Sequence, residues 1–328
     1  MTATSSDQSS PRRAILVTGG GGYIGGLTVA QLACDADLRV IALDAREVPV
    51  ERRAKGVEYI TADIRDPQLV EICRQHAVDT IVHLACIVTP GKQRDRQLEY
   101  SVDVEGTENV LRACVEAGVR QIIVTSSGAA YGYHADNPLP VDEDAPLRGN
   151  EAFAYAHHKR LVEEMLARYR QDHPGLGQLV FRPGAVLGAR TNNQITDLFH
   201  KRFLLGVAGG TTPWVFIWDE DVVACIVQGI QQRATGIYNL AGDGCMSLRE
   251  IAGRLKKPYL PVPAWLLRGV LGLLRLVGAT QYGPEQVDFL RYRPVLSNER
   301  LKSRFGYRPR KDSAQVLDHY LQHAQLAP

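Results

Sequence analysis

The chain has 328 residues, of which 45% are hydrophobic and 23% are charged, and its formal net charge is +2. This length and composition are typical of one large soluble domain with a smaller lobe. A net charge so close to zero gives no electrostatic argument for a nucleic-acid or membrane partner, and we predict neither. Residues 1–13 are polar and rich in serine, and we expect a disordered tail there rather than a signal peptide.

Apolar runs alternate with helical patterns through the first half of the chain. Because continuous apolar runs are typical of strands that are covered on both faces, we predict an α/β, Rossmann-type, doubly wound parallel sheet. Residues 14–184 would form this dinucleotide-binding domain. The runs predict six strands, at 14–19, 38–44, 57–63, 79–85, 120–127 and 176–184, with a long amphipathic stretch at 94–117 and a further helix that begins near Glu151.

The pattern is less regular after residue 184. We predict that residues 185–328 form mainly a smaller substrate-binding lobe that is interleaved with the Rossmann domain. Short strands are expected within 214–218 and 236–242, among helices at about 219–231, 247–255, 264–277 and 312–325.

One apolar segment, at 260–278, could suggest a membrane helix. It is too short to span a bilayer comfortably, and it is interrupted by Arg268 and Arg275, so we predict no membrane span. The two arginines would share one helical face. We favour an amphipathic helix packed on the smaller lobe, with a peripheral membrane contact as the minor alternative.

The cysteines and histidines form no ligand pattern. Six scattered cysteines without a C-x-x-C spacing are typical of buried thiols in a reducing, cytoplasmic environment. The nine histidines make no ligand cluster, so we predict no metal site.

A glycine-rich loop follows the first predicted strand and opens the first helix. Gly19, Gly22 and Gly25 have the spacing G-x-x-G-x-x-G, which allows a tight turn and brings backbone N–H groups close to a pyrophosphate. Asp44 ends the second predicted strand, where a carboxylate binds the ribose 2′-hydroxyl and repels a 2′-phosphate. We therefore predict NAD as the cofactor, with NADP less favoured but kept as an option because of the nearby Arg46.

A serine, a tyrosine and a lysine form a candidate acid–base set. Ser127 ends the fifth predicted strand, and Tyr155 and Lys159 follow at i and i+4 of the next helix, on one face. A phenol has a pKa of about 10, and a neighbouring ammonium lowers it. We predict that Tyr155 moves the proton of a hydroxyl while hydride moves to or from the nicotinamide, and that Ser127 binds the substrate oxygen. His157 and His158 are expected on the exposed helix surface.

Several motifs, in this order, resemble those of the extended short-chain dehydrogenases/reductases, and the closest group is the NAD-dependent epimerase/dehydratase family. They are T-G-G-G-G-Y-I-G (18–25), V-D-V-E-G-T (102–107), T-S-S-G-A-A-Y-G (125–132), Y-A-H-H-K (155–159), F-R-P-G-A-V-L-G (181–188) and Y-N-L-A-G (238–242). The resemblance implies a catalytic set of Ser127, Tyr155 and Lys159. It also implies a homodimer formed through the helices at about 94–117 and 151–172. The cofactor-binding residues would be Gly19, Gly22, Tyr23, Ile24, Gly25, Asp44, Asp63, Ile64, Leu84, Ala85, Cys86, Ser126, Tyr155, Lys159, Pro183 and Val186.

Some positions depart from the family pattern. Asp103 stands where an asparagine is usual, and its role is open. The Asp–Glu pair of 4,6-dehydratases is absent after Ser127, which excludes that chemistry. Ala185 and Trp214 replace an asparagine and an arginine that sugar-nucleotide epimerases usually carry near the diphosphate. A diphosphate contact could still come from Arg190, Arg291 or Arg293. Trp214, Phe216 and Trp218 would share one strand face, which is either lobe core or pocket wall.

The leading hypothesis is an NAD-dependent oxidoreductase that acts on a small molecule with a secondary alcohol or ketone. The alternative is a UDP-hexose 4-epimerase, which shares the same catalytic residues. A non-enzymatic regulator that senses a dinucleotide is a lesser alternative, because both Tyr155 and Lys159 are present.

Overall fold

The computed structural model describes residues 12–88, 95–210, 213–278, 280 and 283–324. The predicted tail therefore lies outside the described residues, except for Arg12 and Arg13. Arg13 already belongs to the first strand, so the sheet begins one residue earlier than we predicted.

A seven-stranded parallel sheet forms the centre of the molecule, which confirms the predicted fold class. Six strands come from residues 13–183. The seventh, β10, comes from the segment that we assigned to the smaller lobe, and it pairs with β6. In spatial order the strands are β10 (Gly236–Leu240), β6 (Gly177–Pro183), β5 (Gln121–Thr125), β4 (Val78–His83), β1 (Arg13–Thr18), β2 (Leu38–Asp44) and β3 (Glu58–Thr61).

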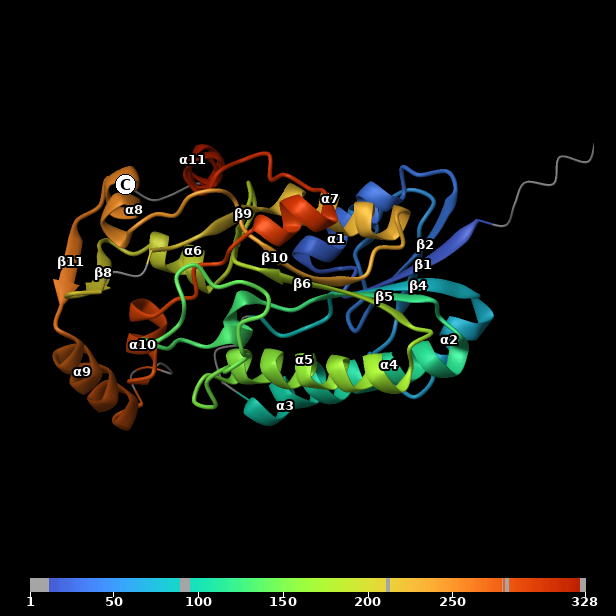
Figure 1. Cartoon of the computed structure of the whole chain (residues 1–328), viewed down its shortest axis with the longest axis horizontal. Coiled ribbons are helices and arrows are strands. Elements are labelled where there is room, and N and C mark those ends of the chain that lie inside the picture. Colours follow the sequence, from blue (N-terminus) through green and yellow to red (C-terminus); the bar gives the residue numbers. More distant parts are fainter. Residues whose placement is uncertain (1–11, 89–94, 211–212, 279, 281–282, 325–328) are drawn as a thin grey trace, which may run out of the picture.

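Helices cover both faces of the sheet (Figure 1). Along β1, Ala14 and Leu16 belong to one buried cluster, and Ile15 and Val17 belong to the other. This alternation explains why the strands read as continuous apolar runs. The first face carries α2 (Leu69–Gln75), α3 (Arg96–Tyr100), the π-helical turn η2 (Ser101–Glu105), α4 (Gly106–Ala117) and α5 (Ala154–Asp172), and the second carries α1 (Tyr23–Leu32), α7 (Asp219–Gln231) and the π-helical turn η4 (Leu301–Phe305).

The smaller lobe, as far as the structure describes it, contains two short parallel strand pairs and five helices. Its core contains Trp214, Phe216 and Trp218, all buried, so the alternating aromatic residues are lobe core. Its elements are β7 (Ala185–Leu187) with β9 (Phe216–Trp218), β8 (Leu204–Val207) with β11 (Tyr259–Val262), and the helices α6 (Gln194–Phe199), α8 (Leu248–Arg254), α9 (Ala264–Leu276), α10 (Gln286–Arg291) and α11 (Ser313–His323). Two short 3₁₀ turns, η1 (Val50–Arg52) and η3 (Gly128–Tyr131), complete the elements of the described residues.

The helix predicted in the apolar segment forms as α9, but its exposed surface is mostly apolar and carries Arg268 and Arg275 as its charged residues. It packs on the lobe through Leu267 and Leu271, whereas Trp265 and Leu276 are 74% and 83% exposed. Among the helices that the structure describes, none combines the length and hydropathy needed to cross a bilayer.

Not all cysteines are buried as we expected. Cys73, Cys114 and Cys225 are buried, but Cys34 and Cys245 are exposed.

Candidate active site

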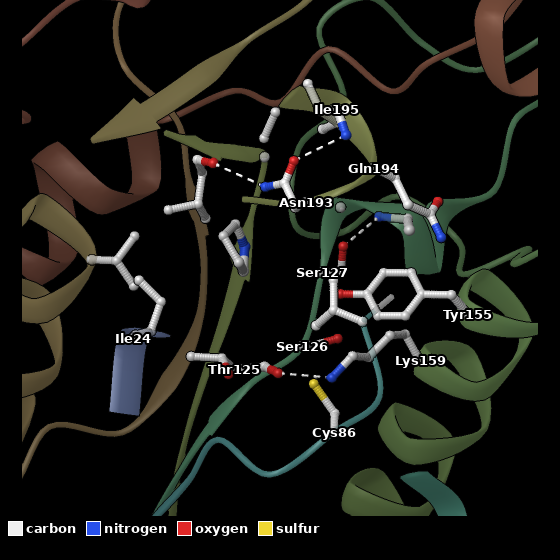
Figure 2. Close-up of a pocket in the computed structure, with 18 of the residues that line it drawn as sticks. Ile24, Cys86, Thr125, Ser126, Ser127, Tyr155, Lys159, Asn193, Gln194 and Ile195 are labelled. Atoms are coloured by element: carbon white, nitrogen blue, oxygen red, sulfur yellow. Dashed lines mark hydrogen bonds between the residues drawn. The ribbon is translucent and has the colours of Figure 1, made fainter. Parts of the chain in front are cut away.

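A cavity of about 360 Å³ lies at the carboxyl ends of β1, β4, β5 and β6, facing the smaller lobe. This is the edge where a doubly wound sheet binds its ligands. The cavity brings together most of the predicted site residues (Figure 2). Those that line it are Gly19, Gly22, Tyr23, Ile24, Gly25, Leu84, Cys86, Ser126, Ser127, Tyr155, Lys159, Pro183 and Val186.

The glycine loop forms a tight turn that only glycine fits. Gly19 has a φ of +70°, and a Cβ atom at this position would lie 2.8 Å from the backbone nitrogen of Ala85. A Cβ atom at Gly25 would lie 2.0 Å from the carbonyl oxygen of Gly19. The turn leads directly into α1, whose first N–H groups lack partners within the helix. These residues therefore fit a pyrophosphate group.

Asp44 lies at the edge of this turn. Its carboxylate accepts hydrogen bonds from the backbone N–H groups of Gly21 (3.1 Å) and Arg46 (3.0 Å). Such bonds fix the carboxylate at the end of β2, beside the glycine loop, which is the position that we predicted for the group that meets the ribose.

Four predicted cofactor residues do not line the cavity: Asp44, Asp63, Ile64 and Ala85. Asp63 binds the guanidinium of Arg65 at 2.6 Å, which lowers the pKa of its carboxyl group. The Ile64 side chain is buried in the core, beneath Gly106. The cofactor contacts that we assigned to these four residues stay predictions.

Ser127, Tyr155 and Lys159 lie together at the end of β5. The Ser127 hydroxyl forms the N-cap of η3, where it accepts a hydrogen bond from the N–H of Ala129 (3.1 Å), and it also hydrogen-bonds the Tyr155 phenol. The Lys159 ammonium donates to the carbonyl of Thr125 at 3.0 Å and lies 5.7 Å from the centroid of the Tyr155 ring. In Figure 2 the phenol oxygen points toward Ser127, and the lysine lies below the ring.

The pKa of Tyr155 differs in direction from our prediction. Burial raises it above its ordinary value, and this effect exceeds the opposite effects of Lys159 and Ser127. Burial disfavours the Lys159 ammonium, but Cys86, Tyr155 and Asp103 together raise the pKa of this lysine. The protein without ligands therefore holds a protonated phenol beside a charged ammonium.

Asp103 and His158 form a buried pair behind this set. One Asp103 oxygen accepts from the N–H of Ile87 (2.8 Å), and the other lies 3.2 Å from Nδ1 of His158. Both side chains are buried, so our expectation of an exposed His158 was wrong. The imidazole supplies the second hydrogen bond that a carboxylate at this position needs, and the pair joins the segment after β4 to α5.

A buried charged network that our sequence analysis missed supports the catalytic strand. Arg182 binds Glu163 with bonds of 2.6 and 2.8 Å and donates to the Tyr131 hydroxyl at 2.7 Å. The Ser126 hydroxyl donates to Glu163 at 2.5 Å, so this side chain is held by the network. The bonded pairs are 19 to 51 residues apart in the sequence, and their spacing gave no signal.

The substrate side of the cavity is largely aromatic and carries one arginine. The Arg293 guanidinium lies 3.9 Å from the centroid of Trp214 and 4.4 Å from that of Phe289. Its Nη1 atom is buried without a hydrogen-bond partner among the described residues, and burial lowers its pKa to about 10. Among the described residues that line the cavity, Lys159 and Arg293 are the cations. Neither Arg190 nor Arg291 lines it.

Sequence reasoning also missed the polar run from Thr191 to Gln194, which lines the cavity. Asn193 caps α6 by accepting from the N–H groups of Ile195 and Thr196. The run follows the motif at 181–188 directly, and that position was the available signal. Ala185 lines the cavity, as does Val215, whose side chain lies on the opposite strand face from Trp214.

Comparison with known proteins identifies this class of protein. The sequence profile of the NAD dependent epimerase/dehydratase family matches residues 15–241. The fold and the glycine turn define a dinucleotide-binding enzyme of the extended short-chain dehydrogenase/reductase type. The chain belongs to the NAD dependent epimerase/dehydratase family, which confirms the predicted family and NAD-dependent enzyme class.

Individual relatives are distant. An uncharacterised protein of Mycobacterium tuberculosis (strain H37Rv) is 24% identical over 320 residues, which cover 96% of this chain and 85% of that protein. UDP-glucose 4-epimerase of Halalkalibacterium halodurans is 33% identical over 215 residues, 63% of each chain. The crystal structure of the Thermus thermophilus UDP-glucose 4-epimerase, a complex with NAD, has a TM-score of 0.71 and 25% identity, and the match covers 95% of this chain and 100% of that one.

Proposed function

We propose that the protein is an NAD-dependent oxidoreductase that transfers hydride between NAD and a small molecule carrying a secondary alcohol or ketone. The observation that carries this proposal is that Ser127, Tyr155 and Lys159 lie together in the cavity that the glycine turn also lines. NAD, rather than NADP, is supported by the position of Asp44 and by NAD in structures of related epimerases.

The residues of the chain would handle the proton. The glycine turn would hold the pyrophosphate, and the nicotinamide of NAD supplies the hydride chemistry. The Ser127 hydroxyl would bind the substrate oxygen. Because burial raises its pKa, Tyr155 carries its proton in the free protein and is ready to donate it to a ketone oxygen. In the reverse direction the same phenol oxygen would receive the proton from the alcohol, with the Lys159 charge stabilising the phenolate.

We further propose that the substrate carries an anionic group. Arg293 is a buried cation with an unused N–H group in a largely aromatic region, which favours a carboxylate or phosphate oxygen at that point.

UDP-hexose 4-epimerase activity is the second candidate. It is supported by the UDP-glucose 4-epimerase relatives and by the Arg293 charge. Against it, Trp214 is buried in the lobe core at the position of an expected arginine, and the described lining of the cavity contains one arginine, Arg293.

Two further features stay proposals. We propose a homodimer through α4 and α5, supported by the exposed apolar residues Leu98, Tyr100 and Val115 beside them. We propose a cytoplasmic location, supported by six free cysteines.

Tyr155→Phe tests the catalytic assignment. Hydride transfer should fall by at least about a thousandfold, because general acid–base catalysis contributes on that order. The affinity for NAD, measured by fluorescence quenching, should change little. The assignment is wrong if turnover survives in this variant.

A panel of secondary alcohols and ketones, followed by NADH absorbance, separates the two candidate functions. A dehydrogenase changes the NADH concentration, whereas an epimerase converts UDP-glucose to UDP-galactose without net production of NADH.

A further inference from the structure

Helix α9 exposes an apolar surface that no described part of the molecule covers. Its inward side packs through Leu267 and Leu271 against the neighbouring strands and α10. A helix on the surface of a soluble protein normally turns polar residues outward, but α9 is apolar on both sides. The exposed large apolar residues of the helix are Trp265 (74% exposed), Leu266 (42%), Val270 (45%), Leu273 (62%), Leu274 (39%), Leu276 (83%) and, just after its end, Val277 (66%).

The exposed surface extends beyond the helix. Phe203, Leu205 and Leu260, on or beside the strand pair β8–β11, are each 40–42% exposed. In Figure 1, β11 leads directly into α9, and both lie at the end of the molecule far from β2 and α2. Large apolar patches of this kind mark interaction sites.

Basic residues outnumber acidic residues in the segments that form this surface. Within 199–210 and 248–278 the acidic residue is Glu250, whereas the basic residues are Lys201, Arg202, Arg249, Arg254, Lys256, Lys257, Arg268 and Arg275. Three of these basic residues pair with a carboxylate: Arg254 with Asp318, Arg268 with Asp288, and Arg275 with Glu285. The local excess therefore comes from the basic residues that form no salt bridge among the described residues, which are Lys201, Arg202, Arg249, Lys256 and Lys257. The net charge of the whole chain, near zero, conceals this local excess.

The apolar surface and its excess of basic residues favour one of two possible binding partners over the other. A second copy of the chain, related by a twofold axis, would bring the same basic residues into opposition and would be repelled. An anionic lipid surface attracts them, and a tryptophan among leucines is typical of helices that lie in the bilayer interface.

We propose that α9 and the adjoining β8–β11 surface bind the protein peripherally to an anionic lipid bilayer, with α9 lying in the plane of the interface. The helix contacts α10, which supplies Phe289 to the cavity. The bound membrane would therefore lie one helix away from the substrate site.

Vesicle binding of the full chain with NAD tests the proposal. Vesicles of phosphatidylglycerol and phosphatidylcholine in equal parts should sediment the protein, and vesicles of phosphatidylcholine alone should bind it more weakly. The variant W265S/L276S should bind the anionic vesicles roughly tenfold or more weakly, because it removes two apolar side chains from the contact. Its matched control, V50S/L139S, alters Val50 and Leu139, which are 74% and 66% exposed elsewhere on the surface. The control should bind like the unmodified protein.

Tryptophan fluorescence gives an independent readout. Trp214 and Trp218 are buried, so a shift of the emission to shorter wavelength on binding would come from Trp265 and should disappear in Trp265→Phe. The proposal is overturned if anionic vesicles do not sediment the protein, or if W265S/L276S binds them as well as the control does. It is also overturned if, without lipid, sedimentation velocity finds a dimer that W265S/L276S dissociates, since a second copy would then cover α9.

Discussion

Replacement of Arg293 by methionine should stabilise the protein while it removes substrate recognition. Burial lowers the pKa of this arginine from its ordinary value to about 10, which corresponds to about 3 kcal/mol by which the native fold disfavours the charge. The cation–π contacts with Trp214 and Phe289 offset part of this cost, by about 0.5–2 kcal/mol. Methionine fills a similar apolar volume without the charge. The expected net effect of Arg293→Met is a gain of about 1–3 kcal/mol in the free energy of unfolding.

Urea unfolding of the ligand-free protein, followed by circular dichroism, measures this change. Arg291→Met is the matched control, because Arg291 lies two residues away and does not line the cavity. The same two variants should differ in activity, with Arg293→Met losing at least about tenfold in kcat/KM toward an anionic substrate and little toward a neutral one. A loss of stability in Arg293→Met would refute the reasoning, since it would mean that the guanidinium is stabilised by its surroundings in the free protein.

Two further predictions concern cofactor binding, and a third concerns the pH dependence of stability. Gly25→Ala should lower the affinity for NAD at least about tenfold in a fluorescence titration, because its Cβ would meet the Gly19 carbonyl at 2.0 Å, whereas at Gly26 the nearest atom is 3.8 Å away and Gly26→Ala should have little effect. Asp44→Ala should narrow the ratio of NAD to NADP affinity by about tenfold, and a preference of the unmodified protein for NADP would contradict the assignment. Burial, with a smaller contribution from Lys159, lowers the pKa of His83 to about 3. The unfolded chain therefore gains a proton between pH 6.5 and about 3 that the native state does not bind. The free energy of unfolding should decrease as the pH is lowered, by about 2 kcal/mol at pH 5. Urea unfolding of His83→Gln should show a weaker dependence on pH.

Most of the fold was predictable because the sheet is buried on both sides. The central residues of strands such as β1 and β2, at 14–17 and 40–43, are then buried and apolar, and this leaves a plain signal in the sequence. The glycine turn and the residues at 155–159 were predictable because backbone geometry and helical spacing restrict them to few residue types. We predicted that the two lobes are interleaved, but the sequence did not indicate that 236–240 is the strand that returns to the sheet, since strand order is set by contacts that a local pattern does not contain.

The electrostatics of the site were less predictable than its members. Lys159 does lie beside Tyr155, but the pKa of the phenol is governed first by burial, which depends on the completed fold. The sequence around His158 is typical of an exposed helix position. The structure buries this side chain against Asp103, which lies fifty-five residues earlier in the chain. For α9 the composition indicated a packed helix, and only the structure reveals how little of it is packed.

The return of β10 to the central sheet means that the chain cannot be divided at residue 184. Without β10 the edge of β6 would be left unpaired, and without α7 and η4 the cluster around Ile123 and Phe181 would face water. The two lobes must therefore fold as one cooperative unit, and a fragment ending at 184 should aggregate rather than bind dinucleotide. The smaller lobe also lines the cavity through 191–195 and 289–296, which lie outside these returning elements, so substitutions there can alter substrate contacts without removing a part of the sheet.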